Sequence, residues 1–229
     1  MSRKKTRGFT LIELMVVVAV ISVIASIALP NLLASRITAN ESSAIATMRS
    51  VITANAQFRS QVAIDRNQNG NGEYAFMAEM AGVVNKRDTL TPNQPPTLPR
   101  KLGIVNQGVV NSAGYFFELY LPGPNGVPVP EAPSGGEANP GDVADDLAEA
   151  HWVLYAWPVD YNGTGRRVFA TSAAGDIIAT PNTNQRYNGL AKRPTGDAAA
   201  PIASQNDITA GLVHQGQASV DGENWTSVN

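Results

Sequence analysis

The chain has 229 residues, of which 43% are apolar and 16% are charged, a length that allows one generous domain or two small ones. Its formal charge of −2 conceals an uneven distribution. The first eight residues hold four basic side chains and no acidic one, and the rest has 13 basic against 19 acidic residues, a formal charge of −6. An acidic body lacks the basic face that nucleic-acid phosphates require, so no nucleic-acid partner is expected. The absence of cysteine excludes disulfides, thiolate metal sites and a lipid-modified cysteine.

The segment Phe9–Leu29 predicts a membrane-spanning helix. It is 21 residues long and Glu13 is its only charged residue. As a helix it would be about 31 Å long, which is enough to cross the hydrocarbon core of a bilayer. The basic cluster before it predicts a cytoplasmic N-terminus, with the residues after Pro30 on the other side of the membrane. A secretory signal peptide is the alternative, but its apolar region would be only about 7–15 residues long.

Glu13 needs a partner, because a charged side chain at the centre of a bilayer costs about 2.5–3.5 kcal/mol on insertion scales. No Lys or Arg occurs between Phe9 and Asn31. The partner must therefore come from another chain, or from an amine that processing creates.

The segment Arg7–Leu14, with the sequence RGFTLIEL, resembles the processing motif of type IV prepilins and type II secretion pseudopilins. The resemblance is strong over residues 1–61 and weak beyond. It implies that a prepilin peptidase removes the leader 1–8 by cutting after Gly8 and methylates the new N-terminal Phe9. It also implies that Glu13 pairs with the Phe9 amine of a neighbouring subunit, and that Pro30 kinks the helix. Such a pair would relieve two desolvated charges at once and fix the axial register of the subunits.

Between Leu33 and Val62, apolar residues recur at intervals of three and four, which predicts an amphipathic helix. Pro30 removes one backbone hydrogen bond and permits a bend or local melting. The first ~55 residues after Gly8 therefore read as one long helix. Its first half, 9–29, spans the membrane and later packs the filament core. Its second half is the spine of a globular domain at 30–229.

The turn-rich segment Asp65–Glu73 follows this helix. Its opening fits the calcium-loop pattern D-x-[DN]-x-[DN]-G, but Phe76 occupies the twelfth position, where a bidentate acid is expected. Two interpretations stay open: a turn ordered by Ca²⁺, and an Asn/Gly-rich connection with positive φ values and no ion. No other cofactor is expected. The candidate calcium ligands are Asp65, Asn67, Asn69, Asn71 and Glu73.

The remaining sequence predicts a small antiparallel sheet. β-branched and aromatic runs bounded by Gly and Pro are typical of strands, and a short Gly-containing link between two runs is typical of a hairpin. Three or four strands packed on the spine helix give an α+β fold, which the resemblance to pilins also implies. The predicted strands are Tyr115–Leu121, Trp152–Trp157, Arg167–Ser172 and Asp176–Thr180, of which the last two form the hairpin.

Four other segments complete the prediction. Tyr74–Val84 predicts a short helix, and Pro92–Pro99 a proline-rich crossing. The Pro, Gly and Glu content of Gly123–Asp142 predicts an exposed loop. Residues 181–229 predict a mostly irregular tail that wraps the sheet or sits on the filament surface.

No enzymatic activity is expected. The motifs of serine hydrolases, P-loop nucleotide-binding proteins and zinc peptidases are absent from the sequence, and there is no cysteine nucleophile. The two histidines, His151 and His214, lie far apart and are expected at the surface or at a strand edge.

The sequence favours a structural subunit of a type IV pilus or pilus-like filament. A pseudopilin of a type II secretion system and a membrane-tethered periplasmic binding module are the alternatives. The resemblance implies partners: copies of the chain and related pilins, the prepilin peptidase, an assembly ATPase and its platform protein, and the lipid bilayer before assembly. It also implies a location in the bacterial inner membrane, with the C-terminal domain in the periplasm, and later in a pilus or periplasmic filament.

Overall fold

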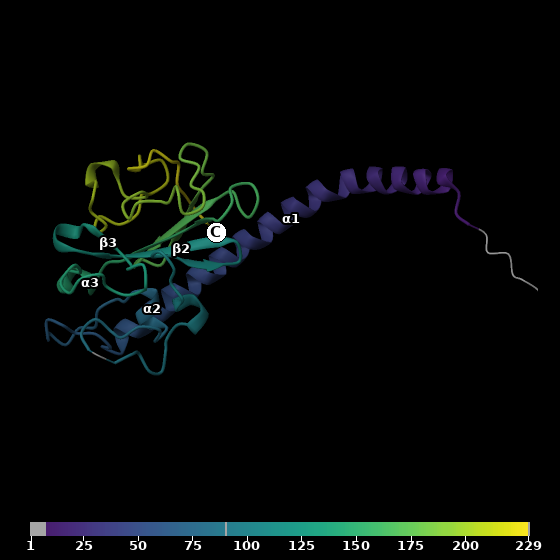
Figure 1. Cartoon of the computed structure of the whole chain (residues 1–229). Helices are drawn as coiled ribbons and strands as arrows, with labels where there is room; N and C mark the ends of the chain where they lie inside the picture. Colours follow the sequence, from purple (N-terminus) through teal and green to yellow (C-terminus); the bar gives the residue numbers. More distant parts are fainter. Residues whose placement is uncertain (1–7, 90, 229) are drawn as a thin grey trace, which may run out of the picture.

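The computed structural model describes residues 8–89 and 91–228. A single helix, α1 (Leu11–Ser60), runs for 50 residues and projects far beyond a rounded domain (Figure 1). This confirms the prediction of one long N-terminal helix. The basic cluster and most of the predicted leader, residues 1–7, lie outside the described residues.

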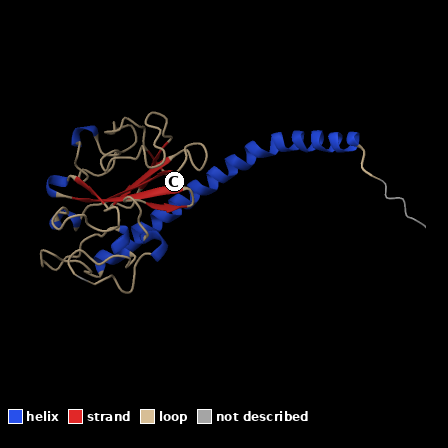
Figure 2. Ribbon diagram, in the orientation of Figure 1, coloured by secondary structure: helices blue, strands red, loops and turns tan. Residues whose placement is uncertain are grey.

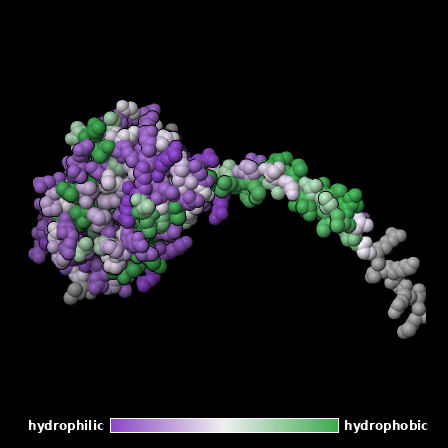
Figure 3. All heavy atoms as spheres, turned by 45° about the horizontal axis from the view of Figure 1, so that its top comes forward, coloured by the Kyte–Doolittle hydropathy of each residue, from purple (hydrophilic) through white to green (hydrophobic). Residues whose placement is uncertain are grey.

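α1 has two halves with different surroundings. We call residues 11–36 the stalk; the side chains there are exposed, apart from a partly covered Ala25. Ile37 is the first buried residue, and buried positions then recur as far as Phe58. α1 is long and apolar enough to cross a membrane, and none of its most apolar 18-residue window is buried in the domain. Figure 3 shows apolar residues gathered along the projecting part, whereas the domain surface is mainly polar.

Within the described residues, one antiparallel sheet of seven strands forms the centre of the domain. Its order is β1-β2-β4-β5-β6-β7, and β3 also pairs with β2. The predicted strands are confirmed as β2, β4, β5 and β6, with β5 and β6 joined as a hairpin. The other three strands have two or three residues each, too few for a period-2 pattern to identify. The strands are β1 (Val110–Ser112), β2 (Tyr115–Pro122), β3 (Pro128–Pro130), β4 (Val153–Pro158), β5 (Val168–Ser172), β6 (Ile177–Thr180) and β7 (Thr226–Ser227).

The sheet is covered on both faces. Every residue of β2 and β4 is buried, and alternate side chains enter different cores because successive residues of a strand point to opposite faces. Phe117 and Leu154 pack with α1 residues such as Met48 in the first core. Tyr120 and Tyr155 pack in the second core. Figure 2 shows the strands as a middle layer with loops on the side away from α1.

The second core is closed by residues 181–228, which are mainly irregular apart from η3 (Ile202–Ser204) and β7. Trp225 is 1% exposed and Ala198 is fully buried. Of the two predicted positions for the C-terminal segment, wrapping of the sheet is the one observed (Figure 1).

Two predictions for the loops were wrong in part. Only α2 (Met77–Met80) is helical within the predicted helix 74–84, because the residues before it are extended and the chain turns at Gly82, with φ of 61°. The segment 123–142 is not simply an exposed loop. It contains β3 and the buried carboxylate of Glu131, which is 3% exposed. The remaining short helices are η1 (Arg100–Gly103), η2 (Pro124–Gly126) and α3 (Asp145–Ala148).

Candidate functional site

The N-terminal end of α1 is closed by a reciprocal cap between Thr10 and Glu13. The Glu13 backbone N–H donates to Thr10 Oγ1 at 3.3 Å. The Thr10 N–H and hydroxyl both donate to Glu13 Oε2, at 2.8 and 2.7 Å. This capping box satisfies two backbone donors that the first turn of a helix leaves without partners. It gives the Glu13 carboxylate hydrogen bonds inside its own chain, which were not among the sequence predictions. The pattern T-x-x-E at Thr10–Glu13 is typical of this cap and could have predicted it.

The predicted processing site lies just before this cap. Gly8 and Phe9 are exposed and not helical, and the Phe9 side chain is 81% exposed. A Cβ built on Gly8 meets nothing within 4 Å, so a bulkier residue there would not disturb the fold of the described residues. Cleavage after Gly8, methylation of Phe9 and the intersubunit role of Glu13 stay predictions.

The stalk presents an apolar surface that runs around the helix. A soluble monomer rarely exposes a continuous apolar patch larger than a few hundred Å². A surface of this kind must be covered by lipid or by other protein. The exposed large apolar residues of α1 are Leu11, Ile12, Leu14, Met15, Val16, Val17, Val18, Val20, Ile21, Val23, Ile24, Ile27, Leu29, Leu32 and Leu33.

Pro30 lies inside α1, and the helix remains continuous through it. Figure 1 shows that α1 bends within its projecting part. Proline in a helix interior removes a hydrogen bond and is a recognised cause of bends. The assignment of the bend to Pro30 remains a prediction.

The predicted calcium ligands do not converge in one cluster. Asp65 accepts backbone N–H groups from Asn69 at 3.1 Å and Gly70 at 3.0 Å, which closes the turn. The side-chain amide of Asn67 donates to Glu149 at 2.8 Å. Glu73 is fully buried, and its Oε1 accepts the backbone N–H of Arg66 at 2.9 Å. Among the described residues, no group of three or more His, Cys, Asp or Glu is arranged to hold a metal ion. Calcium binding remains an untested prediction.

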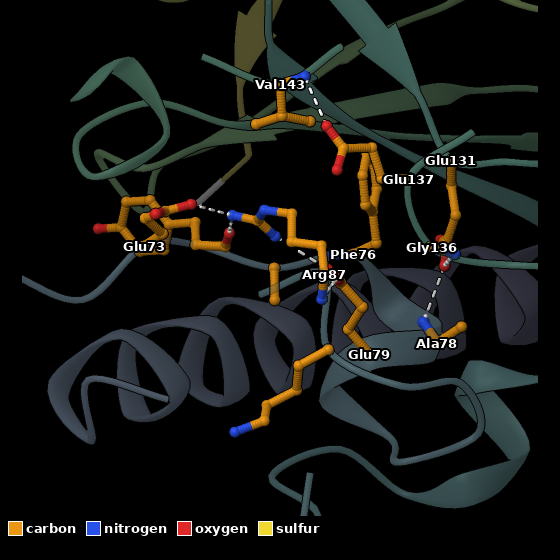
Figure 4. Close-up of polar contacts among 12 residues, drawn as sticks. Glu73, Phe76, Ala78, Glu79, Arg87, Glu131, Gly136, Glu137 and Val143 are labelled. Carbon is orange, nitrogen blue, oxygen red and sulfur yellow. Dashed lines mark hydrogen bonds and ion pairs between the residues drawn. The ribbon is translucent and has the colours of Figure 1, made fainter. Parts of the chain in front are cut away.

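Glu73 belongs instead to a buried charge cluster around Arg87, whose side chain is 2% exposed. Arg87 pairs with Glu73 at 2.7 Å and with Glu79 at 2.9 Å, and it donates to the carbonyl of Tyr74 (Figure 4). Burial raises the pKa of the Glu79 carboxyl, and the charge of Arg87 opposes that rise. The cluster fastens the irregular segment after α2 to the segment before it.

Glu131 performs a similar task at the start of α2. Its carboxylate accepts the N–H groups of Met77 at 3.3 Å, Ala78 at 2.8 Å and Gly136 at 3.2 Å (Figure 4). Burial raises the pKa of this carboxyl to about 8, although the hydrogen bonds from the backbone lower it. Sequence spacing gave no sign of these contacts, because the donors and Glu131 lie more than fifty residues apart, except for Gly136.

A catalytic arrangement is not found among the described residues. His214 is exposed and lines a shallow hollow of about 400 Å³ together with Asp176. His151 lines an adjoining hollow, which shares Ser172 and Ala174 with the first. The described residues give no positive sign of an enzyme.

The architecture is α+β and consistent with a pilin-like fold: one apolar helix projects from a small antiparallel domain, with an exposed Phe9 and a capped Glu13 at its start. Comparison with known proteins agrees with this class. Residues 3–29 match the family described as the prokaryotic N-terminal methylation motif. No solved structure matches the chain significantly.

Three curated proteins are similar to the chain. The type II secretion system core protein G of Dickeya chrysanthemi is 28% identical over 123 residues, which are 54% of this chain and 73% of that protein. The type IV major pilin of Myxococcus xanthus is 39% identical over 75 residues, a third of each chain. The type IV wide pilus major component of Thermus thermophilus is 33% identical over 75 residues, which are 33% of this chain and 54% of that protein. The relatives are thus type IV pilins and a type II secretion pseudopilin.

Proposed function

We propose that this chain is a structural subunit of a type IV pilus or a pilus-like filament, assembled through its N-terminal helix. The exposed apolar stalk carries the proposal, because the described domain has no surface that covers it. Lipid would cover the stalk before assembly, and the stalks of neighbouring subunits would cover it afterwards. The subunit would sit in the bacterial inner membrane with a cytoplasmic N-terminus and a periplasmic domain until then.

The Phe9 amine and Glu13 supply the register in this mechanism. A prepilin peptidase cuts after Gly8 and methylates the amine that is released. Moving a helix from lipid into a bundle of helices yields little hydrophobic free energy, so packing and polar contacts must decide the register. In the single chain, Thr10 donates both of its hydrogen bonds to Glu13 Oε2. The second oxygen, Oε1, has no hydrogen bond within residues 8–89 and 91–228 and would accept the amine of a neighbouring subunit. An assembly ATPase and a platform protein would drive extraction from the membrane.

A second candidate is a pseudopilin of a type II secretion system. The supporting observation is the extent of similarity: the Dickeya protein aligns over 123 residues of the chain, whereas each of the two pilins aligns over 75. Deletion of the gene separates the two functions. Loss of surface filaments indicates a pilus, and accumulation of secreted proteins in the periplasm indicates a secretion pseudopilus.

The decisive experiment is peptide mass spectrometry of the N-terminus, combined with electron microscopy of sheared filaments. The wild-type chain should begin with N-methylated Phe9 and form filaments. Gly8→Val should leave the leader in place, and Glu13→Ala should be processed but form few filaments. Ser22→Ala is the matched control, because it removes only one hydroxyl from the same helix. A wild-type chain that keeps its leader in cells with an active peptidase would contradict the proposal.

A further inference from the structure

The stalk leaves the domain at a point where two polar side chains of α1 are held by a distant loop. Asn40 Nδ2 donates to the carbonyl of Thr164 at 2.8 Å. Glu41, which is 7% exposed, accepts the backbone N–H groups of Arg166 at 3.1 Å and Arg167 at 3.2 Å. It also accepts a hydrogen bond from Arg167 Nε at 2.7 Å. We call these five residues the clamp.

The loop that receives Glu41 is itself tied to the sheet. The Thr164 N–H donates to the carbonyl of Asp160 at 2.8 Å, and the Asp160 N–H donates to Thr164 Oγ1 at 3.0 Å. The Tyr115 hydroxyl, at the start of β2, donates to the carbonyl of Arg167 at 3.0 Å. The loop then leads directly into β5. The clamp therefore connects α1 to a fixed part of the domain.

A small change in the angle of α1 at the clamp produces a large displacement of the N-terminal end of the helix. About 30 residues of α1 lie between Glu41 and Leu11, which correspond to about 45 Å of helix. A tilt of about 10° at the clamp would move that end by about 8 Å, more than one helical turn. Among the described residues, Ile37 is the only buried residue of α1 on the stalk side of the clamp, so little else there opposes such a tilt.

We propose that Glu41 is a positioning residue, which with Asn40 fixes the direction in which the stalk leaves the domain. A carboxylate suits this task, since its two oxygens receive two backbone N–H groups and a guanidinium together. The consequence for assembly rests on the proposed function. When the stalks of neighbouring subunits are bundled, the clamp sets how their domains meet.

The direction of the stalk can be measured by electron–electron double resonance, because spin labels can be placed on introduced cysteines in a cysteine-free chain. Ser22→Cys and Asn111→Cys report the stalk against β1, in the full-length protein in detergent. Ser50→Cys and Asn111→Cys are the matched pair inside the domain. Glu41→Ala should broaden the first distance distribution severalfold and leave the second unchanged. Asn40→Ala should broaden the first distribution less.

Two results would overturn the proposed role of the clamp. One is an unchanged distribution between Ser22 and Asn111 in Glu41→Ala. The other is broadening of both pairs in Glu41→Ala and also in the milder Glu41→Gln, because the contact would then be an ordinary part of the domain's stability. Glu41→Gln retains an acceptor for the backbone N–H groups and loses the charge, so it keeps the test valid where Glu41→Ala fails to fold.

Filament yield tests the consequence for assembly. Glu41→Ala should be processed at Gly8 like the wild type but give a severalfold lower yield of filaments. Normal filaments from a variant with a loosened stalk would refute the role in assembly. Failure of the wild type to form filaments at all would count against the proposed function, and the spin-label distances would still decide the clamp.

Discussion

Glu118 offers a direct test of how the second core responds to pH. It lies on β2 opposite Tyr155 and is 2% exposed. Arg193 pairs with its Oε1 at 3.2 Å, and Oε2 has no partner among the described residues. Burial raises the pKa of this carboxyl from 4.5 to about 7, against the opposing charge of Arg193.

The sign of the effect on stability follows from this rise. The folded domain binds the Glu118 proton more tightly than the unfolded chain, so the contribution is complete below about pH 4.5 and is lost as the pH rises through about 7. The difference between these two values corresponds to about 3 kcal/mol. Glu131, with a pKa of about 8, acts in the same direction. The wild-type domain should therefore be less stable at pH 8 than at pH 5.

Glu118→Gln removes the ionisation and nearly preserves the shape. We expect it to match the wild type at pH 5 and to exceed its stability at pH 8 by up to about 3 kcal/mol, or about 6–12 °C in melting temperature. The assay is thermal unfolding of the full chain in detergent, followed by tryptophan fluorescence. All three tryptophans, Trp152, Trp157 and Trp225, are buried in the domain.

Asp176→Asn, at an exposed position, is the control for a lost surface charge. Its melting temperature should follow the wild type at both pH values. A Glu118→Gln variant that is less stable than the wild type at pH 8 would show that the pair with Arg193 outweighs the burial of the charge. The reasoning would then be wrong.

Three further predictions concern the first core and the turn after α1. Arg87→Ala should lower the free energy of unfolding in urea by about 3–5 kcal/mol, because it leaves buried carboxylates without their counter-charge; a loss below about 1 kcal/mol would contradict this. Asn55→Ala should cost about 1–3 kcal/mol in the same assay, because the buried Asn55 side chain accepts the Ala75 N–H at 3.0 Å. Removal of Ca²⁺ with a chelator should leave the melting temperature unchanged, because both oxygens of Glu73 are already engaged, one by Arg87 and the other by the Arg66 backbone N–H. A rise on adding Ca²⁺ that Asp65→Asn abolishes would instead establish an ion site.

Periodic segments were the part of the fold that the sequence predicted well. The length of α1 follows from an apolar run that continues as an amphipathic stripe, and the four longer strands follow from dense aromatic and β-branched runs between Gly and Pro. The C-terminal residues that cover the second core gave no such signal. Trp225 and Ala198 reach it from segments rich in turn-forming residues, where neither period exists.

The site residues divide in the same way. Gly8, Phe9 and Glu13 stand close together in the sequence, so their pattern could be read directly. The contact between Glu41 and Arg167 joins positions 126 residues apart, and only the folded chain brings them together. Local patterns carry no information about such pairs.

The position of β7 has a consequence for the order in which the domain is completed. Thr226 pairs with Ala179 of β6, and the Val228 N–H donates to the carbonyl of Ile177 at 2.9 Å. Because a chain is made from its N-terminus, the stalk exists long before these last contacts can form. Until the final residues emerge, the edge of β6 stays unpaired and open to other chains. A subunit that lost its last few residues would thus keep its stalk, but would lose the contact of Val228 with the first core and present a bare sheet edge to its neighbours.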